Sequence, residues 1–118
     1  MDLQALTRAL VKFRDERDWS QFHTLRNLIV SLNLEASELL ELTQWKGDPE
    51  IDAMLRDDGR MEALRDECAD ILLYLLLIAE KAGSDLIAAA ERKLVKTELK
   101  YPVAKCFGSS AKYTELPD

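Results

Sequence analysis

Two pairs of carboxylates interrupt the apolar faces of two predicted helices in this chain. Glu35 and Glu38 form the first pair, and Glu67 and Asp70 form the second. Residues three apart in a helix lie on the same side, so each pair points in the direction of the leucines and isoleucines around it. An unpaired carboxylate in apolar surroundings is costly, and such groups are normally paired or bound to a metal ion. We therefore expect a fold in which two helices bring four acids together.

The predicted acidic cluster offers only oxygen ligands, without histidine or cysteine. Such a set suits Mg²⁺ or Mn²⁺ far better than Zn²⁺. A single acidic pair on a helix is usually a solvated surface feature, but two pairs that both lie among apolar residues favour a metal site. Mg²⁺ held by carboxylates keeps several waters and binds substrate phosphates. The sequence thus predicts a Mg²⁺ site, with Mn²⁺ as the alternative ion.

The spacing of apolar residues predicts an all-α fold without a convincing strand. Thr24 is a plausible N-cap of the second helix, and Gly83 is a good C-cap of the third. We expect an antiparallel four-helix bundle in which residues 1–118 form one domain, with a basic, extended tail from about residue 101. The four predicted helices cover residues 2–16, 24–45, 60–82 and 84–99, and the polar stretch 50–59 has room for a short helical turn.

The third predicted helix is apolar almost all round between residues 69 and 79. A helix of this kind must be covered on more than one side. Three other helices of one chain offer too little surface for that, so we predict an oligomer. The apolar run is also far too short to span a bilayer, and the N-terminus resembles an amphipathic helix rather than a signal sequence. We therefore expect a cytoplasmic protein that does not enter a membrane.

The net charge of −6 is spread unevenly along the chain. Residues 92–112 carry six basic side chains and one acidic side chain. This segment is either a solvated helix end with a basic tail, or a surface that holds an anionic substrate such as a triphosphate. Duplex nucleic acid is a poor candidate for a partner, because the chain as a whole is acidic and has no recognition motif.

Three sequence blocks together resemble the all-α MazG-like nucleoside triphosphate pyrophosphohydrolases. ELLELTQWK with the preceding Glu35, DECADILLYL, and the ending KYPVAKCFGSSAKYTELP carry the likeness, and the acidic pairs have the ExxE, 28 residues, ExxD spacing of that superfamily. Within it, the RDWSQFH connector, QWK and the KYP…KYTELP tail resemble the dCTP pyrophosphatase branch. The similarity runs from about Leu3 to Pro117.

The resemblance implies an activity and a set of site residues. The reaction would be hydrolysis of a nucleoside triphosphate, either dCTP or a modified dCTP, to the monophosphate and pyrophosphate, with water attacking the α-phosphorus. The acids Glu35, Glu38, Glu67 and Asp70 match the Mg²⁺ ligands, and Glu35 or Glu38 would orient or deprotonate the water. The implied assembly is a homotetramer, a dimer of dimers with active sites at subunit boundaries. The implied substrate contacts are Trp19, Gln21, Phe22, His23, Trp45, Tyr74 and Lys93.

Two departures from the family pattern concern the choice of base. Thr97 stands where the family often has asparagine, and Leu10 stands where a relative has a polar side chain near the nucleotide. A broad-specificity house-cleaning hydrolase of deoxynucleotides is therefore an alternative to a dCTP-selective enzyme. A helical binding module without turnover is a second alternative, and the intact set of four acids argues against it.

Overall fold

The computed structural model describes residues 1–118 and consists of helices and loops, without a strand. The predicted all-α class is thus confirmed. The chain divides into two units, Met1–Ser84 and Asp85–Asp118, which are described separately. None of the helices combines the length and the apolar character that crossing a membrane requires. The elements are α1 (Leu3–Glu16), α2 (Leu25–Glu41), α3 (Asp48–Met54), α4 (Asp58–Lys81), α5 (Leu86–Lys100), α6 (Val103–Cys106) and the 3₁₀ helix η1 (Tyr113–Glu115).

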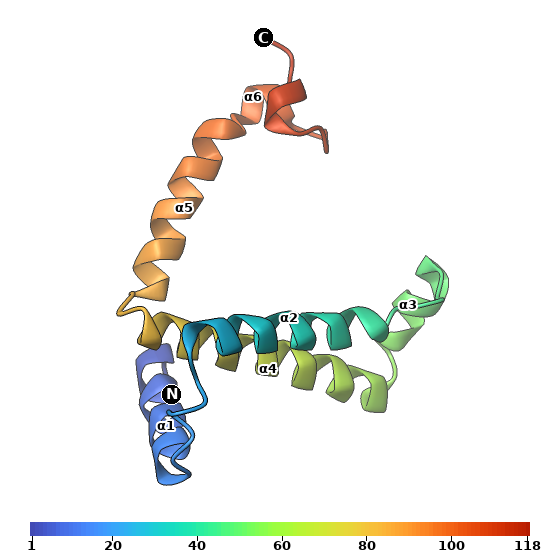
Figure 1. Ribbon diagram of the computed structural model, residues 1–118. Coiled ribbons are helices and arrows are strands. Elements are labelled where there is room, and N and C mark those ends of the chain that lie inside the picture. Colours follow the sequence, from blue (N-terminus) through green and yellow to red (C-terminus); the bar gives the residue numbers. More distant parts are fainter. The chain divides into compact units, whose positions relative to one another are not determined.

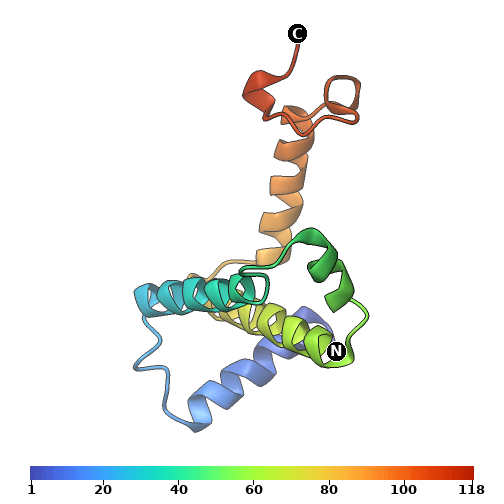
Figure 2. The same cartoon turned by 90° about the vertical axis from the view of Figure 1, so that its right-hand side faces the viewer.

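In the first unit, α2 and α4 lie side by side and run antiparallel, whereas α1 packs across α4 near the end of that pair (Figures 1 and 2). The buried apolar side chains are Leu28 of α2, Leu76 and Leu77 of α4, and Met54 of α3. The apolar faces of α2 and α4 therefore meet each other, and the acidic pairs on the same faces are carried toward one another.

Local capping interactions determine where these helices begin and end. The Thr24 hydroxyl accepts a hydrogen bond from the backbone N–H of Asn27 at 3.1 Å, as its predicted role as N-cap of α2 requires. Gly83 ends α4 at a φ of +63°. The N–H of Ser84 donates to the carbonyl of Ala79 at 2.8 Å, which completes a Schellman motif. The start of α2 and the end of α4 agree with the prediction, because each is determined by one residue, Thr24 or Gly83.

Two boundaries differ from the prediction. Helix α2 ends at Glu41, and Trp45 lies beyond it in a succession of tight turns, with a φ of +65°. Helix α4 begins at Asp58 rather than at residue 60, because Asp57 accepts a hydrogen bond from the N–H of Arg60 at 3.0 Å. The polar linker also contains α3, where Pro49 occupies the first helical turn and needs no N–H partner there.

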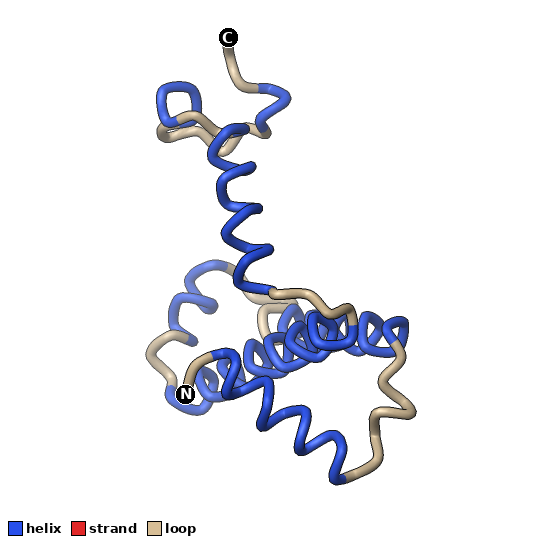
Figure 3. Tube along the Cα trace, turned by 90° about the vertical axis from the view of Figure 1, so that its left-hand side faces the viewer, coloured by secondary structure: helices blue, strands red, loops and turns tan.

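The second unit contains α5 and the C-terminal segment. Helix α5 stops at Lys100, since a residue before proline disfavours the helical conformation. Instead of remaining extended, the tail forms α6 and η1 (Figure 3). The Tyr113 N–H donates to the Tyr101 hydroxyl at 3.3 Å, and their rings pack edge to face with centroids 6.0 Å apart. Two tyrosines therefore fold the tail back onto the end of α5.

Candidate active site

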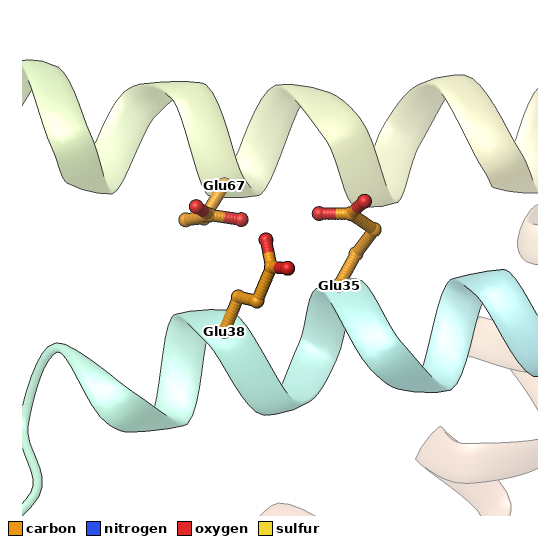
Figure 4. A group of neighbouring side chains, drawn as sticks. All are labelled: Glu35, Glu38 and Glu67. Atoms are coloured by element: carbon orange, nitrogen blue, oxygen red, sulfur yellow. The ribbon is translucent and has the colours of Figure 1, made fainter.

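Three of the four predicted acids meet between α2 and α4. One carboxylate oxygen each from Glu35, Glu38 and Glu67 lies within 4.8 Å of the others. Figure 4 shows the two α2 side chains and the α4 side chain projecting into the space between the helices. We refer to these three residues as the acidic cluster. The arrangement follows from antiparallel packing, which sets the middle of one helix against the middle of the other.

Asp70 lies one helical turn beyond Glu67 and interacts electrostatically with the acidic cluster. Burial, and after it the adjacent carboxyl of Glu38, raises the pKa of Glu35 to about 7, and the charge of Asp70 acts in the same direction. Burial and then the charge of Glu38 likewise raise the pKa of Glu67, with a smaller contribution from Asp70. Four negative groups therefore repel one another in this region of the molecule.

The acidic cluster has two buried oxygens that no hydrogen-bond donor reaches. These atoms are Oε2 of Glu35 and Oε2 of Glu67. No lysine or arginine forms an ion pair with the cluster, because all ion pairs of the chain involve other residues. Buried charged oxygens without a donor are unfavourable unless a cation coordinates them. The oxygen-only donor set fits a divalent cation such as Mg²⁺ or Mn²⁺.

A cavity of about 250 Å³ adjoins this region. Asp70 contributes to its wall, so the same side chain belongs to the cavity and to the electrostatic surroundings of the acidic cluster. Most of the remaining wall is apolar or aromatic, which is typical of a site for a flat organic ring. The lining residues are Phe13, Trp19, His23, Asp70, Leu73, Tyr74 and Leu77.

The turn after α1 places Trp19 against this cavity. Asp18 adopts the left-handed conformation at a φ of +53°, which aspartate tolerates better than most residues. The following N–H, that of Trp19, donates to the carbonyl of Arg14 at 3.1 Å, so the chain doubles back at the end of the helix. The Trp19 ring then meets Phe13 edge to face, with centroids 5.6 Å apart.

His23 contributes a polar atom to the aromatic side of the cavity. Its Nδ1 is buried and has no hydrogen-bond partner, and its ring lies 6.5 Å from that of Trp19, centroid to centroid. Burial, and then the positive charge of Arg14, lowers the pKa of His23 below its usual 6.5. The imidazole is therefore neutral at pH 7, and its free nitrogen can form a hydrogen bond with a ligand.

The other predicted substrate contacts lie outside the cavity lining. Phe22 is 60% exposed and Trp45 is 92% exposed, and neither contributes to the wall. The Gln21 amide donates to the carbonyl and the carboxylate of Asp18, at 3.1 and 3.0 Å, so it serves the connector itself. Lys93 is exposed on α5 of the second unit.

The sequence did not identify Phe13, Leu73 and Leu77 as part of the cavity wall. All three lie on the apolar stripes of their helices, and the periodicity of the sequence does not distinguish a core residue from a residue that lines a cavity. The available signal was the position of Phe13, just ahead of the aromatic connector that contains Trp19. Whether such a residue faces a core or a cavity depends on how α1 packs on α4, which periodicity does not specify.

Comparison with known proteins shows similarity over almost the whole chain. The model of the MazG-like family matches residues 30–116. The chain is 40% identical over 115 residues to dCTP pyrophosphatase 1 of Rattus norvegicus and of Homo sapiens, and 41% identical to that of Bos taurus. Each match covers 98% of this chain and 68% of the relative. The crystal structure of a pyrophosphatase from Archaeoglobus fulgidus superposes with a TM-score of 0.75 at 40% identity, covering 84% of this chain and 91% of the other.

The fold, together with these relatives, assigns the protein to the nucleoside triphosphate pyrophosphohydrolases, a class of enzymes. More particularly, the chain belongs to the MazG-like family and to its dCTP pyrophosphatase branch. The resemblance inferred from the sequence blocks is thereby confirmed.

Proposed function

We propose that this enzyme hydrolyses dCTP or a base-modified dCTP, in the presence of Mg²⁺, to the monophosphate and pyrophosphate. The observation that carries the proposal is the adjacency of two features, an acidic cluster with unpartnered oxygens and an aromatic cavity, which Asp70 joins. The first feature suits the triphosphate with its cation, and the second suits the base. The names of the curated relatives, dCTP pyrophosphatase 1, support the choice of substrate.

The acids have two proposed roles. Glu35, Glu38, Glu67 and Asp70 would hold Mg²⁺, which when bound stabilises negative charge on the phosphate oxygens and on the departing pyrophosphate. Glu38 is the exposed member of the acidic cluster, whereas Glu35 and Glu67 are half-buried. We assign Glu35 or Glu38 to orient the water that attacks the α-phosphorus and to take up its proton.

The cavity is proposed to bind the base between aromatic side chains. Trp19 of the connector and Tyr74 of α4 each offer a flat aromatic surface. His23 offers a neutral nitrogen that can form a hydrogen bond with the base. A volume of about 250 Å³ is below the range of roughly 300–1,000 Å³ that holds drug-sized ligands. The cavity therefore has room for a single nucleobase, and the names of the curated relatives favour cytosine.

The exposed predicted contacts fit a site that a second subunit completes. Gln21, Phe22, Trp45 and Lys93 remain proposed substrate contacts in a homotetramer with active sites at subunit boundaries. Large apolar side chains exposed along α2 support such an assembly, namely Leu25, Ile29, Val30 and Leu34. Light scattering should then give four times the 13.4 kDa of one chain, and the mass of a single chain would contradict the tetramer.

The family match to residues 30–116 supports treating both units as one functional domain.

A nucleotide panel tests the proposed function. dCTP, 5-methyl-dCTP, dUTP, dTTP and dATP are each incubated with the enzyme, with and without Mg²⁺, and the products are separated. We expect dCMP and pyrophosphate from dCTP only when Mg²⁺ is present. Comparable turnover of dATP and dUTP would instead establish the broad-specificity alternative. No turnover of any nucleotide would favour the binding module.

A further inference from the structure

Arg14 connects two helices that form different walls of the cavity. Its Nη1 donates to Oε2 of Glu80 at 2.8 Å, while its Nε donates to Oδ1 of Asp15 at 2.8 Å. The first bond joins α1 to the last turn of α4, across 66 positions of sequence. The Arg14 side chain is only 11% exposed, so much of this interaction is shielded from water.

No other ion pair in the chain joins two helices. The remaining ion pairs connect residues at most four positions apart, as Lys12 and Glu16 do within α1. The Arg14–Glu80 bond is also the single side-chain hydrogen bond between any two α-helices of the structure. Since α1 packs on α4 less extensively than α2 does, this bond holds a weakly attached helix in place.

Arg14 also connects to the aromatic side of the cavity through its backbone. Its carbonyl accepts the hydrogen bond from the Trp19 N–H at 3.1 Å, and it directly follows Phe13, which lines the cavity beside Trp19. On the opposite side, Glu80 lies one turn beyond Leu77, another lining residue. One residue therefore ties Phe13 and Trp19 to the α4 wall.

We propose that Arg14 is a positioning residue for the substrate base, because its bond to Glu80 fixes the aromatic wall of α1 and the connector against the wall of α4. The inference rests on the proposed function, in which the base occupies this cavity. Loss of the bond would let α1 and Trp19 move away from α4 while leaving the acidic cluster between α2 and α4 intact. Base binding should weaken, whereas the chemical step should not.

A double-mutant cycle of Arg14→Gln and Glu80→Gln tests the proposal by steady-state kinetics with dCTP. Each single variant should raise KM about three- to fivefold with kcat changed less than about twofold, the size expected when a partly exposed ion pair is lost. The double variant should be no worse than Arg14→Gln alone, because both substitutions remove the same bond. Lys12→Gln removes a matched charge from the exposed side of α1 and should leave both constants unchanged.

A second measurement does not depend on turnover. In a Trp45→Phe background, Trp19 is the single tryptophan, and its quenching by acrylamide reports its accessibility. Quenching should increase in Arg14→Gln and in Glu80→Gln but not in Lys12→Gln. If the parent enzyme does not hydrolyse dCTP, the proposed function is wrong while the quenching still tests the positioning role. Unchanged KM and unchanged quenching, additive effects in the double variant, or a lowered melting temperature as the only effect would each overturn the proposal.

Discussion

Glu35 and Glu67 face each other across the α2–α4 pair, with carboxylate oxygens within 4.8 Å, and each has one buried oxygen that no donor reaches. Without a cation, this arrangement opposes folding, since like charges repel and the buried oxygens have lost their water. With a divalent cation, the same arrangement becomes a preformed set of ligands. The energetic cost of the acidic cluster in the metal-free protein is thus the strongest argument that the cluster binds a divalent cation.

Glu67→Gln should separate metal binding from folding. The amide removes one negative charge and supplies N–H donors to the neighbouring acids, so the metal-free variant should melt at the wild-type temperature or slightly above it. Mg²⁺ should no longer stabilise it, and kcat should fall on the order of 100-fold or more, as for loss of a group that stabilises transition-state charge. Differential scanning calorimetry with EDTA or Mg²⁺, together with a turnover assay, makes the comparison.

Glu41→Gln is the matched control for that variant, because Glu41 is an exposed acid at the end of α2 outside the acidic cluster. It should keep the response to Mg²⁺ and the activity. A full thermal response to Mg²⁺ in Glu67→Gln would show that the cation binds elsewhere.

The raised pKa of Glu35 predicts how stability depends on pH. The folded value of about 7 exceeds the ordinary 4.5, so the folded protein holds this proton more tightly than the unfolded chain does. The contribution of Glu35 to metal-free stability should therefore be largest below pH 4.5 and be lost as the pH rises from 4.5 through about 7. Mg²⁺ must displace the proton, so its stabilising effect should be larger at pH 8 than at pH 5.

Thermal unfolding across this pH range, in EDTA and in Mg²⁺, measures both effects. Other groups titrate in the same range, and Glu35→Gln corrects for them because it lacks only this proton. The decline should be shallower in Glu35→Gln than in the wild type. Identical pH profiles for the two proteins would be inconsistent with a raised pKa at this position.

The chain has one histidine, so its NMR titration belongs to His23 without ambiguity. Burial and the charge of Arg14 predict a midpoint below 6.5. In Arg14→Gln the midpoint should move upward toward 6.5, because one of the two causes is gone while burial remains. A wild-type midpoint at or above 6.5 would mean that the ring is solvated and does not face the cavity.

The boundaries of some helices could be predicted from the sequence, and those of others could not. Thr24 and Gly83 were correctly identified as caps because capping depends on one side chain or one backbone conformation. The predicted start of α4 lies two residues late because the whole polar stretch 50–59 was assigned to the connector, whereas the Asp57 cap begins the helix at Asp58 and outweighs the cost of Gly59 in its first turn. Helix α3 forms because Pro49 lies in the first turn, the place in a helix that tolerates it.

The acidic cluster could be predicted from helical periodicity, as the apolar face of an amphipathic helix can. Polar residues at helical spacing within an apolar stripe must face whatever that stripe faces, so Glu35, Glu38 and Glu67 had to meet once α2 and α4 paired. The cavity was not predictable in this way, because contact between Phe13 and Trp19 depends on the turn at Asp18. That turn uses a left-handed aspartate, which the sequence alone does not reveal.

Trp19 should contribute most of the binding of the base. Trp19→Ala removes a flat ring from the cavity wall and should raise KM for dCTP about tenfold, in line with the ~1–3 kcal/mol of a base stacked on an aromatic side chain. Phe107→Ala truncates an aromatic side chain that is 89% exposed in the second unit and serves as the control. Equal KM values for Trp19→Ala and the wild type would place the base outside this cavity.

Hydrolysis of dCTP in ¹⁸O-labelled water tests the central claim most directly, since it identifies the phosphorus atom that water attacks. Attack at the α-phosphorus predicts Mg²⁺-dependent formation of dCMP that carries the label, together with unlabelled pyrophosphate, and both products should form on the order of 100-fold more slowly with Glu67→Gln. Release of orthophosphate, or label in the pyrophosphate rather than in dCMP, would contradict the account.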